Sequence, residues 1–387
     1  MSRRSLSRAG AVKKTQIRYP ERRCEGASAR LATGHGSGQS APGVDASRIR
    51  AASGKAMWGI GVQRQLSGLA DLHAGEAQIS RLEKRLGRLH ARQRLGVERD
   101  HEGQVLGQGI GFFHLENSRL VARLIGAVLK GTGTYGRGLR NATKVELRHN
   151  IIALPRLPTA FNGFSILHLS DLHCDTSERA MPRVVEMVGR VDYDICVITG
   201  DYRGRTFGPV EPSLRGFATV RSAIRGPVYG VLGNHDSIWM LPHLEKMDVA
   251  VLMNEAIAIE RNGALLHLAG IDDAHFYRTD NIEKAAEKIP HDECSILLSH
   301  TPEIYRQAAH AGFDLMLSGH THGGQICLPG GFALTLASVL PRHLGAGLWR
   351  HQTMLGYTSV GAGTALVPVR FNCPPEITLH RLVPDQA

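Results

Sequence analysis

The chain has 387 residues, of which 42% are hydrophobic, so it is long enough for one large domain and an appendage. Its formal net charge is +11, but this charge is unevenly distributed. Residues 1–150 carry 27 Lys and Arg against 11 Asp and Glu, whereas residues 151–387 carry 19 against 24. The larger part of the chain is therefore mildly acidic, which argues against nucleic acid as a partner.

The cysteine pattern and the hydropathy of the chain give an expected location. The six cysteines are scattered and include no CxxC pair, a distribution that fits free thiols in a reducing compartment. There is no run of 18 apolar residues, so we predict no transmembrane helix. Residues 2–6 are similar to a twin-arginine export signal, but no apolar core follows them. We expect a cytoplasmic protein, with peripheral contact to the inner membrane left open.

The N-terminal third predicts a tail followed by a weakly defined region. Residues 1–55 are rich in Arg, Gly, Ser and Ala, and they cannot bury enough apolar surface to offset chain entropy. We expect a basic, disordered tail there. Residues 56–150 are expected to form a poorly defined, helical, basic region, and residues 151–387 the main domain.

Two amphipathic segments are expected within residues 56–150. In the first segment, residues 63–95, apolar residues recur at helical spacing among charged ones: Ile79, Leu82, Leu86 and Leu89. The second is residues 117–130, with Asn117 or Ser118 as a possible N-cap and basic residues at Arg119, Arg123 and Lys130. This helix is expected either to lie on an anionic bilayer surface or to pack against the main domain.

From Phe164 onward, short apolar runs each end in a polar cluster. In order, FSILHL precedes SDLH, DICVIT precedes GD, PVYGVL precedes GNHD, SILL precedes SHTPE, and DLML precedes SGHTHGG. Helical segments are expected between several of these strands, at residues 178–190, 211–225 and 282–288. Alternating strands and helices predict an α/β architecture, in which ligands gather at the carboxyl ends of the strands.

The first polar clusters have the composition of metal ligands. Asp171 and His173 stand two residues apart after a strand, so an extended loop turns both side chains toward one ion. Asp201 follows Gly200, and its carboxylate has two oxygens with which to bridge two metals. The same Asp-Leu-His triplet at residues 71–73 is interpreted as a decoy, because no strand precedes it.

The later clusters complete a set of possible ligands. Asn234 offers a neutral oxygen ligand, and His235 beside it is expected to project toward a substrate. His300 follows one strand, and His320 and His322 alternate around Thr321 after another. Any one histidine among the 20 in the chain is uninformative, but five ordered clusters behind five strands are not explained by chance.

Taken together, the five blocks resemble the calcineurin-like metallophosphoesterase superfamily, whose pattern runs D-x-H, G-D, G-N-H-D/E, H and G-H-x-H. The match covers about residues 158–382. The resemblance implies an α/β fold, a four-layer αββα sandwich of two mixed β-sheets flanked by helices. It implies one metal held by Asp171, His173, Asp201 and His322, and a second held by Asp201, Asn234, His300 and His320. His235 would be the catalytic contact to phosphate.

The same resemblance implies hydrolysis of phosphoester bonds by a metal-bridging hydroxide, with a phosphodiester, pyrophosphate or monoester of a small-molecule or lipid-linked compound as substrate. Mixed Asp, Asn and His ligation suits two divalent ions of Mn, Fe or Zn better than Mg. The segments LPRLPTAFNGFSILHLSDLH and GTALVPVRFNCPPEITLHRL look like a bacterial branch that includes phosphodiesterases and UDP-diacylglucosamine pyrophosphohydrolases.

One departure from the family pattern changes the expected mechanism. Phosphoprotein phosphatases of the superfamily have G-D-x-x-D in the second block, and this chain has Gly204 at the final position. In those phosphatases the final Asp of the block orients the catalytic histidine. Because this chain lacks it, Asp236 is our substitute candidate for orienting His235. A protein phosphatase is therefore disfavoured. Arg370 and Arg203 either contact a substrate phosphate or form surface salt bridges.

Two further interpretations compete with a complete enzyme. In the first, the fold is a non-catalytic metal-binding scaffold whose basic N-terminal region binds nucleic acid or anionic membrane. Loss of ligands would favour it, but all seven expected ligands are present. In the second, residues 1–110 come from a misplaced translation start and are foreign to the natural protein.

Overall fold

The computed structural model describes residues 75–102, 119–336 and 338–385. The chain divides into two compact units, and the boundary falls between Arg88 and Leu89. In the first unit, the described residues 75–86 are helical and end at Gly87, which adopts a φ of 89° typical of a helix C-terminus. The expected apolar stripe is therefore interrupted, and Leu89 beyond it is 81% exposed.

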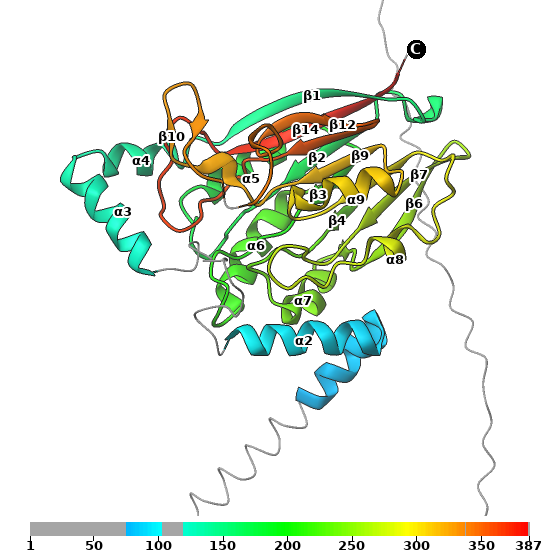
Figure 1. Cartoon of the computed structure of the whole chain (residues 1–387), viewed down its shortest axis with the longest axis horizontal. Helices are drawn as coiled ribbons and strands as arrows, with labels where there is room; N and C mark the ends of the chain where they lie inside the picture. Colours follow the sequence, from blue (N-terminus) through cyan, green and yellow to red (C-terminus); the bar gives the residue numbers. More distant parts are fainter. Residues whose placement is uncertain (1–74, 103–118, 337, 386–387) are drawn as a thin grey trace, which may run out of the picture. The chain divides into compact units, whose positions relative to one another are not determined.

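The second unit contains two six-stranded sheets (Figure 1). The first sheet has the strand order β1-β14-β2-β3-β4-β5, with β14 antiparallel to β2 and the other neighbours parallel. Its strands are β1 (Glu146–Leu154), β14 (Glu376–Pro384), β2 (Ser165–Leu169), β3 (Ile195–Ile198), β4 (Val228–Gly230) and β5 (Val249–Val251). The predicted start of the main domain, residue 151, falls inside strand β1.

The second sheet has the order β12-β13-β9-β8-β7-β6, with antiparallel pairs at both edges and parallel pairs between them. Its strands are β12 (Gly347–His351), β13 (Met354–Thr358), β9 (Leu315–Ser318), β8 (Ser295–Leu298), β7 (Ala264–Gly270) and β6 (Glu255–Arg261). A short hairpin joins β10 (Cys327–Leu328) to β11 (Phe332–Ala333). Both large sheets are mixed, as the sequence predicts.

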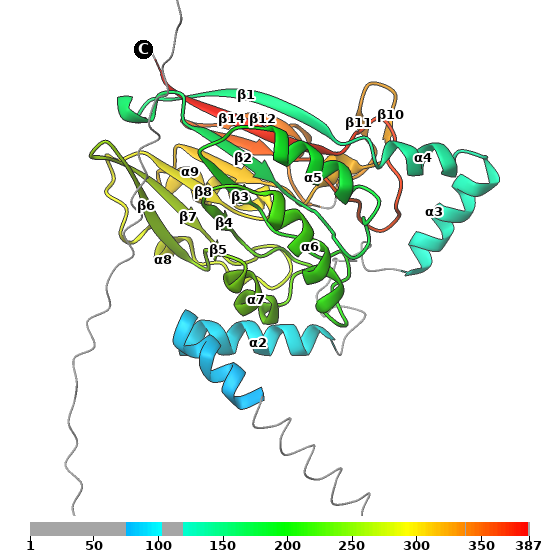
Figure 2. The ribbon, with the colours of Figure 1, turned by 180° about the vertical axis from the view of Figure 1, so that it is seen from behind.

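Helices cover the outer faces of the two sheets (Figure 2). Helices α5 (Met181–Arg190), α6 (Glu211–Ala223) and α7 (Leu241–Lys246) lie on the first sheet, and α8 (Ile282–Ala286) and α9 (Tyr305–His310) on the second. The remaining helices are α2 (Arg88–Glu102), α3 (Arg119–Gly131) and α4 (Tyr135–Asn141). None of the described helices is long and apolar enough to cross a membrane.

Alternation along the strands builds the core on both faces of the second sheet. Ile296 and Leu298 of β8 face the first sheet, where they join a cluster with Ile166 and Val197. Leu297 points the other way and packs under the outer helices. Because central strands such as β3, β8 and β9 are buried on both faces, the apolar runs read from the sequence are continuous rather than alternating. The four-layer sandwich is confirmed.

The predicted strands end where the polar clusters begin. β2, β3, β4, β8 and β9 correspond to the five apolar runs, and α5, α6 and α8 correspond to the three expected helical segments. The expected tail of residues 1–55 and the decoy triplet at residues 71–73 lie outside the described residues.

Candidate metal centre

The expected ligand side chains converge from the carboxyl ends of five strands and are all buried. Several of them occupy the left-handed region of backbone space, which non-glycine residues rarely adopt. These are Asp171 (φ 50°), His173 (φ 46°), Asp201 (φ 54°), His320 (φ 72°) and His322 (φ 49°). Such conformations persist only where the surrounding structure imposes them, and they concentrate at functional sites.

The first cluster that could hold a metal ion consists of Asp171, His173 and His322. His173 Nε2 lies 3.0 Å from His322 Nε2, and His322 Nε2 lies 3.4 Å from Asp171 Oδ1. Ser170 Oγ donates to Asp171 Oδ2 at 2.5 Å and fixes the carboxylate. Three donor atoms of the kind that bind Mn, Fe or Zn therefore face one point.

The second cluster consists of Asp201, His300 and His320, and Asn234 lies among them. Asn234 Oδ1 is 2.8 Å from His300 Nε2 and 2.8 Å from His320 Nδ1. Asp201 Oδ2 is 3.4 Å from His300 Nε2 and 3.8 Å from His173 Nε2. Asp201 thus borders both clusters, as a shared ligand would.

The hydrogen bonds on the far side of the rings determine which nitrogens have free lone pairs. His173 Nδ1 lies 2.9 Å from the Arg203 carbonyl oxygen, and His300 Nδ1 lies 2.7 Å from the Thr199 carbonyl oxygen. A carbonyl oxygen only accepts, so both Nδ1 atoms carry hydrogen and both neutral rings present an Nε2 lone pair. His300 Nε2 then faces the Asn234 oxygen, an acceptor, at 2.8 Å, and a proton or a metal ion on Nε2 would satisfy this contact.

The nearby carboxylates also affect the pKa values of the histidines in the second cluster. Burial alone would lower the pKa of His300, but the nearby carboxylates, Asp201 first, raise the pKa to about 10. The carboxylates therefore favour positive charge at His300, whereas burial and the neighbouring His275 and His300 lower the pKa of His320 in the same cluster. The residues present therefore fit a binuclear centre, whose metal identity the ligand types do not select.

Two glycines allow the loops to approach this closely. A Cβ on Gly319 would lie 1.9 Å from Ser170 Oγ and 2.3 Å from Asp171 Oδ2. A Cβ on Gly233 would lie 2.2 Å from Asp201 Oδ1. Any side chain at either position would displace a candidate ligand, so these glycines are required by close contact.

His235 borders the cluster and is held by a residue that the sequence did not indicate. Its Nε2 lies 3.9 Å from Asp201 Oδ2, and its backbone N–H donates to Asp201 Oδ1 at 3.0 Å. On the other side of the ring, Nδ1 lies 2.6 Å from Thr206 Oγ1. Thr206 has no sequence signal, because its role depends on a loop that brings it to His235.

The orienting role expected of Asp236 is therefore corrected. Asp236 Oδ2 accepts from the backbone N–H groups of Asp201 (2.8 Å) and Gly233 (2.9 Å), and Oδ1 accepts from that of Arg203 (3.2 Å). Its carboxylate thus joins two ligand loops instead of touching the His235 ring. Burial and the adjacent charge of Asp201 raise the pKa of Asp236 to about 7.

The structure explains why glycine occupies position 204. The Gly204 N–H donates to Asp175 Oδ1 at 2.6 Å, and a Cβ on Gly204 would lie 2.1 Å from Thr176 Oγ1. The aspartate found there in phosphoprotein phosphatases would press its Cβ against Thr176, so the Thr176 side chain would have to move.

The surface salt bridges suggested for Arg370 and Arg203 are not observed. Arg370 is fully buried, and its guanidinium donates to the carbonyl oxygens of Val360 (2.7 Å) and Gly363 (2.7 Å). It also lies 3.3 Å from His322 Nδ1, directly behind the first cluster. Arg203 is 2% exposed and donates to the Thr206 carbonyl oxygen. Arg370 therefore holds the loop of residues 360–363 beside His322, and Arg203 holds the loop that carries Thr206.

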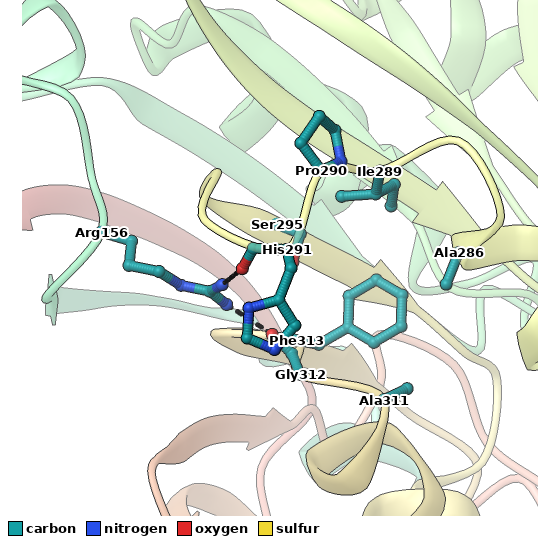
Figure 3. A pocket seen from close by; sticks show the side chains of 9 residues that line it. All are labelled: Arg156, Ala286, Ile289, Pro290, His291, Ser295, Ala311, Gly312 and Phe313. Atoms are coloured by element: carbon teal, nitrogen blue, oxygen red, sulfur yellow. Dashed lines mark hydrogen bonds between the residues drawn. The ribbon is translucent and has the colours of Figure 1, made fainter.

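A separate pocket contains none of the candidate ligands (Figure 3). Its lining includes Arg156, whose Nε donates to Asp314 Oδ1 at 2.8 Å and whose other nitrogens donate to the carbonyl oxygens of His291 and Gly312. The guanidinium joins two loops at this place. We therefore interpret this pocket as structural.

Two mixed sheets whose strand ends bring together two buried His/Asp clusters define a metallophosphoesterase, a metal-dependent hydrolase of phosphoesters. The model of the calcineurin-like phosphoesterase family matches residues 164–324, and the chain belongs to this family.

Several relatives share this domain. The chain is 31% identical over 256 residues to the uncharacterized metallophosphoesterase YkoQ of Bacillus subtilis (strain 168), which covers 62% of this chain and 93% of that protein. It is 31% identical over 296 residues to a transmembrane protein with metallophosphoesterase domain from Bos taurus, covering 70% of this chain and 65% of that protein. An uncharacterized metallophosphoesterase of Helicobacter pylori (strain ATCC 700392 / 26695) is 29% identical over 71% of this chain and 74% of its own length.

Proposed function

We propose that this hydrolase uses two divalent ions, bound by Asp171, His173, Asp201, Asn234, His300, His320 and His322, to cleave a phosphodiester, pyrophosphate or monoester. The observation that carries this proposal is the pair of buried His/Asp clusters on either side of Asp201, whose Oδ2 lies 3.4 Å from His300 Nε2 and 3.8 Å from His173 Nε2. When bound, such ions supply Lewis acidity that polarises phosphoryl oxygens and activates water.

The protein's own groups position the substrate and move a proton. Thr206 holds His235 Nδ1 at 2.6 Å, which leaves the Nε2 edge of the ring toward Asp201 and the substrate side. A ring held in this way can protonate the leaving oxygen. His235 is our candidate catalytic residue, and Asp236 supports it by fixing the loop that carries both His235 and Asn234.

Metal-dependent hydrolysis tests the proposal directly. Full-length protein stripped with a chelator should not cleave bis-p-nitrophenyl phosphate or p-nitrophenyl phosphate, and added Mn²⁺ should restore turnover. Comparing the two compounds distinguishes a diesterase from a monoesterase. Turnover that persists in the metal-free protein would contradict the proposal.

A lipid-linked substrate and a peripheral position at the cytoplasmic face of the inner membrane are supported by α3. One face of the helix packs against the main domain through Ala122, Ile125 and Leu129. The opposite face exposes Leu120 (66%), Leu124 (58%) and Val128 (64%). The two sequence interpretations are therefore compatible, because packing against the domain uses only one side of α3.

Charge identifies the partner that this exposed face fits best. Residues 119–141 contain five basic residues and no acidic one: Arg119, Arg123, Lys130, Arg137 and Arg140. An apolar stripe flanked by cations alone is complementary to an anionic bilayer surface.

Figures 1 and 2 place the β10–β11 hairpin at the same end as α3 and α4, and Leu328 and Phe332 of this hairpin are 46% and 56% exposed. The similarity to a relative named as a transmembrane protein also supports a membrane-associated role.

Vesicle sedimentation tests the bilayer proposal. The protein should bind vesicles containing phosphatidylglycerol, and Leu124→Glu should weaken this binding about tenfold or more, because burial of one leucine is worth about 1.5–3 kcal/mol. The matched control is Leu348→Glu, an exposed leucine of β12 (48% exposed). Equal binding of wild type and Leu124→Glu would contradict the proposal. So would the finding that the protein forms a dimer that Leu124→Glu dissociates.

A further inference from the structure

Helix α2 contains a fully buried arginine. The Arg94 guanidinium donates from Nε to Asp272 Oδ1 at 3.3 Å, and it lies 3.2 Å from the centroid of the Tyr277 ring. His90, one turn earlier, is 2.9 Å from Asp272 Oδ2. Asp272 follows β7, 178 residues away in sequence, so α2 is attached to the main domain by a buried charge pair.

The same arginine contacts the loop that carries the candidate catalytic histidine. Arg94 Nη2 donates to the Asp236 carbonyl oxygen at 2.9 Å, and Asp236 directly follows His235. Asp236 is therefore held at two points, since its side chain accepts from the backbone of Asp201 and Gly233. The main-chain bond fixes the peptide that joins Asp236 to Ser237, one residue beyond His235.

Glu98, one turn further along α2, accepts hydrogen bonds from Ser237 and Ile238, the two residues that follow Asp236. Its carboxylate accepts from the Ile238 N–H at 3.0 Å and from the Ser237 hydroxyl, and it pairs with Arg94 Nη1 at 3.2 Å. These contacts satisfy the first N–H of the short helix that follows His235. One face of α2 thus holds three consecutive residues, 236 to 238.

We propose that Arg94 and Glu98 are positioning residues that hold His235 at its working distance from the metal centre. This inference rests on the proposed function, because it assumes that His235 acts in catalysis. It extends the catalytic unit upstream to α2, well before residues 164–324 that match the family. It also implies that residues 89–102 are native to this protein, against the interpretation that residues 1–110 are foreign.

Burial makes the arrangement sensitive to the exact side chain. Removing one partner of a buried ion pair leaves an uncompensated charge, so both stability and loop position respond to Arg94. Displacement of a catalytic group by about 1 Å is enough to cost about 10²-fold in rate. If Arg94 acts by positioning His235, its substitution must slow the protonation of the leaving group that His235 performs. A general loss of stability would not slow that step selectively.

Arg94→Met in the full-length protein tests the proposal with a series of aryl phosphodiesters. Their leaving groups run from p-nitrophenol, which needs little protonation, to phenol, which needs more. We expect kcat to fall about 10²-fold for the phenyl ester, with a much smaller loss for the p-nitrophenyl ester and little change in KM. Arg94→Lys should recover part of the loss, and Arg92→Met, an exposed site on the same helix, should match wild type.

Two comparisons make the result decisive. If Arg94→Met unfolds, Glu98→Gln tests the same loop, because it keeps the shape of the side chain while weakening its bonds to Ser237 and Ile238. An equal loss for every leaving group, or no loss, in the folded variant would overturn the inference. His235→Ala serves as the reference: if it shows no leaving-group dependence, the proposed role of His235 fails as well, whereas a dependence seen in His235→Ala alone overturns only the role of Arg94.

Discussion

Asp201→Asn is expected to lower kcat for metal-dependent phosphodiester hydrolysis by about 10³-fold, equivalent to several kcal/mol of transition-state stabilisation. Asp201 Oδ2 lies 3.4 Å from His300 Nε2 and 3.8 Å from His173 Nε2, so its charge serves both clusters. The asparagine keeps the size of the side chain and removes that charge. Initial rates at saturating Mn²⁺ measure the effect.

A surface carboxylate provides the matched control for this variant. Asp192 is 98% exposed in its side chain and pairs only with the surface Arg225 among the described residues. Asp192→Asn should therefore keep wild-type kcat. A turnover for Asp201→Asn within a few fold of wild type, at the same metal concentration, would show that Asp201 does not serve both metals.

His235→Ala should lower kcat by about 10²–10⁴-fold, the usual contribution of general acid catalysis. The His235 backbone N–H donates to Asp201 Oδ1, so the loop should remain in place when only the ring is removed. The loss should be greatest for poor leaving groups, and the bound metal should be unchanged. Steady-state kinetics on aryl esters, with metal analysis of the same samples, measures both.

The control for this variant is His243→Ala, an exposed histidine on α7. It should leave both activity and metal content unaltered. A His235→Ala protein that loses metal along with activity would mean that His235 holds the centre together, and the proton-transfer role would then be wrong.

Local sequence signals were sufficient to predict the strands and the candidate ligands. Each ligand cluster directly follows an apolar run, because parallel strands in a sandwich of this kind are buried on both faces and bring their carboxyl ends to one edge. Asp171 and His300 could be selected in this way, although they belong to different sheets. The prediction needed only short-range patterns and the order of the clusters.

The residues that the sequence missed act through long-range contacts. Thr206 reaches His235 from a loop 29 residues earlier, and Arg94 reaches Asp236 across 142 residues. Neither has a neighbouring motif that marks it. Asp236 shows the opposite error: adjacency to His235 suggested that the two side chains interact, but the Asp236 carboxylate turns to the backbone of Asp201 and Gly233.

The sequence also did not predict the unusual backbone conformation of the candidate ligands. Asp171, His173 and Asp201 adopt left-handed φ angles, and although Asp and His adopt this conformation more often than most residues, the residue type alone does not say where it occurs. Glycine at position 319 is required by a close contact, because a Cβ there would lie 2.3 Å from Asp171 Oδ2.

The number of metal ions bound per chain tests the central claim most directly. Elemental analysis of the full-length protein after equilibrium dialysis against Mn²⁺ should give two ions per chain, and His322→Ala, which removes a ligand from the first cluster alone, should give one. Activity should follow occupancy of both sites. A wild-type protein that hydrolyses phosphodiesters with one ion or none would contradict the binuclear account.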